Sequence, residues 1–136
     1  MLQRIMGLSL LLFATAASAG QPARFGETCD GMEIMRVGQQ PNRMLPFHIH
    51  LNFDLSARRY CYDTCARAQS YDIADIVPPL VVMSDVDLPE QRRWMVFDPV
   101  AQRLVDEQRI ALGPMTTLRH VSVACKPADF IAPAPH

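Results

Sequence analysis

The chain has 136 residues, 49% of them hydrophobic, and its 13 basic and 14 acidic residues give a formal net charge of −1. This length allows one ordinary domain with one core and is too short for two. Without a basic excess, neither nucleic acid nor an anionic membrane surface is expected as a general partner.

The first 19 residues have the features of a bacterial export signal. Arg4 supplies the positive charge, residues 5–14 form an apolar run, and Ala17-Ser18-Ala19 is a small-residue cleavage site. The apolar run is shorter than the roughly 20 residues that a membrane-spanning helix needs. We therefore predict a signal peptide over residues 1–19, cleavage near Ala19, and a periplasmic or secreted product without a stable membrane anchor.

Residues 20–28 are polar and small and include a proline, which predicts a flexible lead-in. A short strand is expected over residues 32–37, followed by a turn at residues 38–42, which is dense in Gly, Pro and Asn. The clearest periodicity comes next, because apolar and polar residues alternate for nine positions. The apolar set is Phe47, Ile49, Leu51, Phe53 and Leu55. This alternation predicts a half-buried strand with those five side chains in the core and the polar set facing outward.

The second half of the chain also indicates strands. Pro78-Pro79 separates two apolar stretches and marks a bend or a sheet edge. Residues 94–97 and 103–110 flank turn-forming residues and predict a hairpin, and a last strand is expected over residues 117–124. The end of the chain, residues 131–136, is a Pro-rich tail.

Short strands at intervals of about ten residues are typical of small antiparallel domains. The sequence therefore predicts one β-rich domain over residues 29–130. Its fold class is mostly β, a small antiparallel sandwich or barrel stabilised by two disulfides.

The disulfides follow from four cysteines, Cys29, Cys61, Cys65 and Cys125. An even count in an oxidising compartment predicts two bridges, and three pairings are possible. We favour Cys61–Cys65, which are close in sequence, with Cys29–Cys125, which would join the two ends of the domain. Three residues separate Cys61 from Cys65, whereas redox-active thioredoxin-like motifs have two, so a structural bridge is expected.

His48 and His50 are the candidate metal ligands, because residues two apart on a strand point to the same face and a pair of imidazoles can chelate Zn(II), Cu(II) or Ni(II). His120, Asp54 or Glu33 would have to complete the site. Two histidines on the polar face of a strand are also typical of a plain solvated surface, and we favour that interpretation.

Two further features could contact a partner. Residues 85–90 form an acidic loop that begins Asp85-Val86-Asp87, and Trp94 follows Arg92 and Arg93. Tryptophan and arginine are enriched at binding hot spots, although a lone tryptophan in a small β domain more often belongs to the core. The sequence contains no hydrolase, zinc-protease, P-loop or dinucleotide-binding motif, and no catalytic residues are predicted.

The chain resembles a loose set of small exported bacterial proteins of unknown function. The residues that carry the resemblance are Phe53-Asp54-Leu55, Tyr60-Cys61 with Cys65, residues 73–76, and Cys125 with Asp129-Phe130. Those proteins share an F-x-x-D-L strand, a Y-C-x3-C turn and a C-terminal cysteine. The resemblance covers residues 29–130 and implies a fold type and export. Pro78-Pro79 and the Met-rich start do not match it.

Together these features predict an exported, non-catalytic binding or accessory protein that uses no cofactor, with an envelope protein as a candidate partner. Two alternatives remain open. One is a periplasmic metal-binding protein that uses His48 and His50. The other is an inhibitor of an envelope hydrolase that acts through an exposed loop such as residues 85–90.

Overall fold

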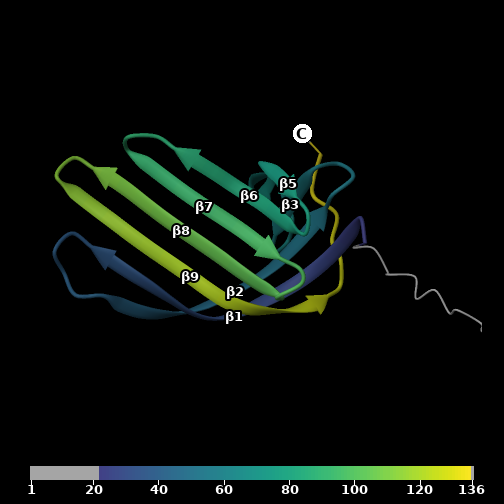
Figure 1. Ribbon diagram of the computed structural model, residues 1–136, viewed down its shortest axis with the longest axis horizontal. Helices are drawn as coiled ribbons and strands as arrows, with labels where there is room; N and C mark the ends of the chain where they lie inside the picture. Colours follow the sequence, from purple (N-terminus) through teal and green to yellow (C-terminus); the bar gives the residue numbers. More distant parts are fainter. Residues whose placement is uncertain (1–21, 136) are drawn as a thin grey trace, which may run out of the picture.

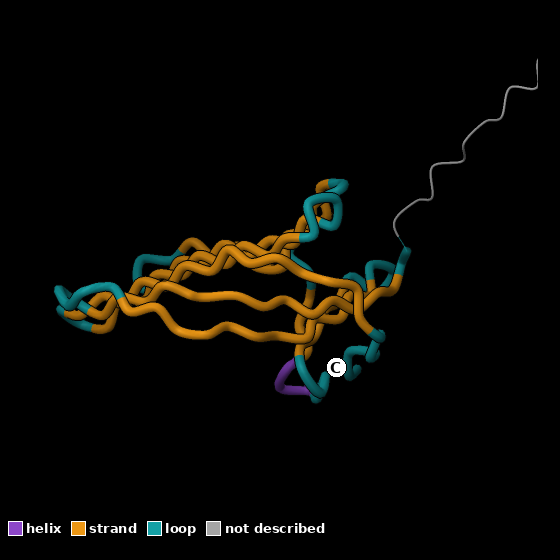
Figure 2. Tube along the Cα trace, turned by 90° about the horizontal axis from the view of Figure 1, so that it is seen from below, coloured by secondary structure: helices purple, strands orange, loops and turns teal. Residues whose placement is uncertain are grey.

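The computed structural model describes residues 22–135, so the predicted signal peptide lies outside the described part of the chain. Within it, 67% of the residues are in strands, and these form one antiparallel sheet that curls into a half-barrel, in the strand order β4-β3-β2-β1-β9-β8-β7-β6-β5 (Figures 1 and 2). The elements are β1 (Arg24–Val37), β2 (Arg43–Asp54), β3 (Arg59–Tyr62), the 3₁₀ turn η1 (Arg67–Gln69), β4 (Ser70–Asp72), β5 (Asp75–Val77), β6 (Leu80–Asp87), β7 (Gln91–Asp98), β8 (Arg103–Leu112) and β9 (Met115–Ala128). The predicted fold class, mostly β with two disulfides, is confirmed.

Two meanders, β1 to β4 and β6 to β9, build the sheet, and the pairing of β1 with β9 joins them. In Figure 1 the strands β6, β7, β8 and β9 lie side by side, and β1 and β2 continue the sheet beneath them. Because β1 pairs with both β2 and β9, the first and last strands occupy the middle of the sheet. The short strands β4 and β5 are its two edges.

The core lies on the concave face of this sheet. At its centre, the Phe53 ring stacks between Phe25, with ring centroids 4.9 Å apart, and Phe97, with centroids 5.1 Å apart. Such offset aromatic pairs add to the free energy gained by burying their apolar surface. The five apolar residues of the predicted alternating strand all belong to this core or pack against it, as predicted.

Both predicted disulfides are present. Cys29 and Cys125 are directly opposite each other on β1 and β9, and Cys61 and Cys65 join β3 to the turn that follows it. Two structural disulfides indicate an oxidising environment outside the cytoplasm. None of the helical turns within residues 22–135 has the length and apolar character needed to cross a membrane.

The flexible lead-in predicted for residues 20–28 is wrong from Arg24 onward, since β1 begins there. Glu27 is only 3% exposed and Cys29 is fully buried. Pairing with a strand on each side holds this segment in extended conformation, which outweighs the weak strand preference of its Gly and Glu residues.

The Pro-rich tail is bonded to the sheet. The Ile131 N–H donates to Asn52 Oδ1 at 2.7 Å, and the Ala134 N–H donates to Ser70 Oγ at 3.0 Å. The outer face of β2 is consequently less solvated than its alternation predicts. Asn52 is fully buried and Asp54 is 8% exposed, whereas the sequence predicted outward-facing polar residues. The tail and the Cys61–Cys65 bridge cover Asn52, whose Nδ2 lies 3.3 Å from Cys65 Sγ.

Candidate functional site

The concave face holds an interior cavity of about 270 Å³, formed by side chains from both meanders. It is lined by Phe47 and Ile49 of β2, Tyr60 and Tyr62 of β3, Tyr71 of β4, Arg93 and Met95 of β7, Asp106 of β8 and Arg119 of β9. The strand registers place all of these side chains on the same face as the apolar core. The curl of the sheet thus brings side chains from six strands around one small cavity with polar groups.

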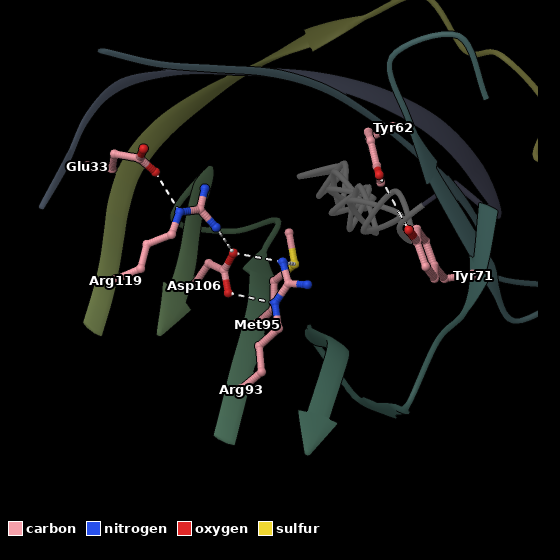
Figure 3. Close-up of polar contacts among 7 residues, drawn as sticks. All are labelled: Glu33, Tyr62, Tyr71, Arg93, Met95, Asp106 and Arg119. Carbon is pink, nitrogen blue, oxygen red and sulfur yellow. Dashed lines mark hydrogen bonds and ion pairs between the residues drawn. The ribbon is translucent and has the colours of Figure 1, made fainter. Parts of the chain in front are cut away.

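A chain of four charged side chains crosses one wall of this cavity (Figure 3). Asp106, which is 1% exposed, accepts hydrogen bonds from Arg93 Nε at 3.0 Å and Arg93 Nη2 at 2.9 Å, a bidentate pair. Asp106 Oδ2 also accepts from Arg119 Nη1 at 3.1 Å, and Arg119 Nε donates to Glu33 Oε2 at 2.6 Å. The hydrogen bonds to Asp106 raise the pKa of the Arg93 guanidinium. Two positive and two negative charges therefore balance within the network.

The two guanidinium groups keep unused donors. The hydrogen bonds found within residues 22–135 use Nε and Nη2 of Arg93 and Nε and Nη1 of Arg119, and none uses Arg93 Nη1 or Arg119 Nη2. Arg119 also lies over the Phe47 ring, with its guanidinium carbon 5.5 Å from the ring centroid. Arg93 and Arg119 both line the cavity.

Three tyrosines form the opposite side of the cavity. The rings of Tyr60 and Tyr71 stack with centroids 5.5 Å apart, and those of Tyr62 and Tyr71 with centroids 5.9 Å apart. The hydroxyl oxygens of Tyr62 and Tyr71 are 3.3 Å apart, and the Tyr71 hydroxyl donates to the Ala68 carbonyl at 3.0 Å. Burial raises the pKa of Tyr60 to about 12, and the hydrogen bond with Tyr71 raises the pKa of Tyr62. Tyr60 and Tyr62 are therefore neutral at physiological pH.

The predicted metal ligands lie on the other face of the sheet. His48 Nδ1 contacts the Asp30 carboxylate, and His50 Nε2 is 2.9 Å from the Asp129 carbonyl oxygen. The side chains proposed to complete the site have other partners: Asp54 bonds to Arg24, Glu33 to Arg119, and His120 lies 3.3 Å from Glu107. Residues 22–135 contain no group of three or more His, Cys, Asp or Glu that could hold a metal ion. Metal binding by His48 and His50 therefore stays a prediction.

The candidate partner residues come together on the outer face. Asp85, Asp87, Arg92 and Trp94 line an open groove of about 640 Å³ over β6 and β7, which continues across β8, β9 and β1. Trp94 is 42% exposed, so it does not belong to the core. Arg93, which the sequence analysis grouped with Trp94, instead extends its side chain into the interior network.

The interior cavity was not predicted from the sequence, although the sequence contains a signal for it. Arg93 shares the strand face of Met95 and Phe97, Asp106 that of Leu104, and Arg119 that of Val121 and Val123. A charged residue at an otherwise apolar alternation position is a reason to expect a buried polar site. The sequence does not show that Arg93, Asp106 and Arg119 lie next to one another, because that depends on how the sheet curls.

Comparison with protein-family models, with curated proteins and with solved structures found no match for this chain.

Proposed function

We propose that this chain is an exported binding protein that holds a small neutral ligand in the interior cavity. The observation that carries the proposal is the combination of unused guanidinium N–H groups and stacked tyrosine rings on residues that line one small cavity. Small-molecule sites have this composition, with apolar and aromatic walls and a few polar groups that fix orientation. The cavity lies just below the usual range of about 300–1,000 Å³, which favours a ligand the size of a single ring.

The charge balance of the cavity indicates a neutral ligand. Arg93 and Arg119 are already balanced by Asp106 and Glu33, so an added anion would leave an excess negative charge in a poorly solvated space. A carbonyl or hydroxyl oxygen can accept from the free N–H groups without adding charge. A flat apolar ring would pack against the tyrosines. The proposed ligand is thus a ring compound with oxygen acceptors.

A matched pair of probes tests this proposal. Benzamide and benzoate have the same shape and differ in charge, and binding is measured from chemical-shift changes in ¹⁵N spectra. We expect benzamide to shift Tyr71, Arg93 and Arg119 and benzoate to bind more weakly. Equal or tighter binding of benzoate, or shifts away from the cavity, would contradict the proposal.

A pair of aromatic variants supplies the control. Tyr71 and Trp94 are 41% and 42% exposed, so both can be replaced by alanine without opening the core. Only Tyr71 lines the cavity. We expect Tyr71→Ala to weaken benzamide binding severalfold and Trp94→Ala to leave it unchanged. Loss of binding in both variants would indicate a general effect on folding.

The two disulfides and the sequence of the first 19 residues support the exported location in this proposal. Cell fractionation and mass analysis of the purified protein test it. We expect a periplasmic or secreted product whose N-terminus is at or next to Gly20. An intact Met1, or recovery in the membrane pellet, would contradict export with cleavage.

A second candidate function, inhibition of an envelope hydrolase, is favoured by the outer groove. Trp94 and Arg92 lie beside Asp85 and Asp87 there, a combination of an exposed aromatic anchor and charges. The test adds the purified protein to an envelope extract and measures peptidoglycan hydrolysis. Inhibition that Trp94→Ala abolishes and Tyr71→Ala retains would favour this function over ligand binding.

A further inference from the structure

A second cavity, of about 810 Å³, opens where the start of β1, the turn between β7 and β8, and the end of β9 meet. It shares no lining residue with the interior cavity. Its walls are mainly apolar and include Phe25, Val100 and Phe130, and its polar lining includes Glu27 and Gln102. The interior site of the proposed function is not involved, so the inference below does not depend on it.

Two buried oxygen atoms in this cavity have no hydrogen-bond partner among the described residues: Glu27 Oε2 and Gln102 Oε1. Glu27 is 3% exposed, so its carboxyl group has little access to bulk water. Leaving a buried acceptor unsatisfied costs about 1–3 kcal/mol and more for a charged group, and such atoms in a native fold require an explanation.

The two hydrogen bonds that the Gln102 side-chain NH₂ group donates fix the orientation of its amide. Gln102 Nε2 donates to Glu27 Oε1 at 3.3 Å and to the Pro99 carbonyl at 3.0 Å. Both acceptors lack hydrogens to give, so exchanging the amide oxygen and nitrogen would lose both bonds. Gln102 Oε1 is therefore an acceptor, as is Glu27 Oε2. Two residues of the cavity lining thus each have a buried acceptor without a hydrogen-bond partner among the described residues.

We infer that this cavity binds the primary ammonium group of an amphiphilic amine. An ammonium has three N–H donors and no acceptor, which complements two unpaired oxygens, one of them on a carboxylate. The apolar part of the amine would pack against Phe25, Val100 and Phe130.

The charges around the cavity favour a cation. Asp129 lines the cavity as a second acidic residue. Arg24, the cation in the lining, already donates to Asp54 Oδ2 at 3.1 Å, so its charge is balanced. A cation beside Glu27 also compensates the burial of that carboxylate, which otherwise raises the pKa of Glu27.

Phenethylammonium is the probe, and 2-phenylethanol and phenylacetate are its neutral and anionic counterparts. Binding to the wild-type protein is followed by ¹⁵N chemical shifts and quantified by calorimetry. We expect phenethylammonium to bind with shifts at Gln102, Val100 and Phe130, and the two counterparts to bind much more weakly. Absence of binding at millimolar concentration, equal binding of 2-phenylethanol, or shifts confined to other residues would overturn the inference.

Glu27→Gln is the test variant because it keeps the side-chain shape and removes the charge. We expect it to weaken phenethylammonium binding about tenfold or more, since hydrogen bonds to charged groups are the stronger ones. Glu90→Gln, a carboxyl change in an exposed loop outside the cavity, is the matched control and should bind as the wild type does. Unchanged affinity in Glu27→Gln would overturn the inference. The wild-type shift map tests the site without any substitution, should that variant fail to fold.

Discussion

At the scale of single residues, Asp106 has the most demanding environment. It is almost fully buried and accepts three hydrogen bonds from two guanidinium groups. Removing one member of a buried ionic network leaves the others uncompensated, which typically costs about 3–5 kcal/mol. We therefore expect Asp106→Asn to lower the free energy of unfolding by about that amount in urea titration.

Asp87→Asn is the control for this change. Asp87 pairs with Arg92 at 2.9 Å, but both side chains are well exposed, so this pair should contribute less than about 1 kcal/mol. Equal destabilisation by the two substitutions would show that the interior network has no special role in stability.

The burial of Glu27 should make the free energy of unfolding depend on pH. Burial raises the pKa of its carboxyl group above the ordinary value of 4.5. Because the folded-state pKa is the higher one, the fold binds the proton more tightly than the unfolded chain does. The resulting stabilisation is present below pH 4.5 and is lost as the pH rises through the raised pKa. Glu27→Gln removes this effect, so we expect the variant to be more stable than the wild type at neutral pH. Urea titrations between pH 4 and 8 check this, and parallel stability profiles for the two proteins would contradict it.

At the scale of secondary-structure elements, the outer face of β2 is where metal binding can be tested. His48 and His50 lie on that face, and the remaining ligands proposed for a site are bonded elsewhere. We expect the double change His48→Ala and His50→Ala to alter the free energy of unfolding by no more than about 1 kcal/mol, as surface substitutions usually do. Calorimetry with Zn(II) and Cu(II) accompanies this measurement. Submicromolar metal binding that the double change abolishes would favour the metal-binding alternative.

The pairing of β1 with β9 carries the long disulfide. Cys29 and Cys125 are 96 residues apart in sequence, and Cys61 and Cys65 only four. Closing a long loop constrains the unfolded chain more than closing a short one. Replacing Cys29 and Cys125 by alanine should therefore cost about 2–5 kcal/mol in the free energy of unfolding, and the same change at Cys61 and Cys65 clearly less. A larger loss from the short bridge would contradict this order.

At the scale of the whole molecule, the middle strands of the half-barrel are more stable than its edge strands. The central strands β1 and β9 pair on both sides and are joined covalently, whereas β4 and β5 have three residues each and pair on one side. Local opening is easiest where there are few buried contacts and bonds. We expect amide hydrogens of Ser70–Asp72 and Asp75–Val77 to exchange much faster than those near Cys29 and Val121. Hydrogen–deuterium exchange followed by NMR measures this, and uniform protection across the sheet would contradict it.

Much of the fold could be predicted because its signals are local. Alternation in β2 identified the five apolar side chains that belong to the core or pack against it. Pro78-Pro79 marked the edge hairpin, and the cysteine count with the spacing of Cys61 and Cys65 favoured the observed pairing. The start of β1 and the attachment of the tail could not be predicted in this way. Both depend on partners that are distant in sequence, such as Asn52 for Ile131.

The sequence by itself determined the mostly β fold class and the apolar face of β2, and it favoured the observed cross-links, because a period of two and a cysteine pattern are properties of the chain alone. Only the tertiary structure decided the candidate sites. Curling of the sheet brings Arg93, Asp106 and Arg119 opposite the tyrosines of β3 and β4, and the ends of β1 and β9 bring Glu27 beside Gln102. Such convergence depends on the curvature of the sheet and on contacts between residues as far as 86 positions apart, and no local pattern encodes either of them.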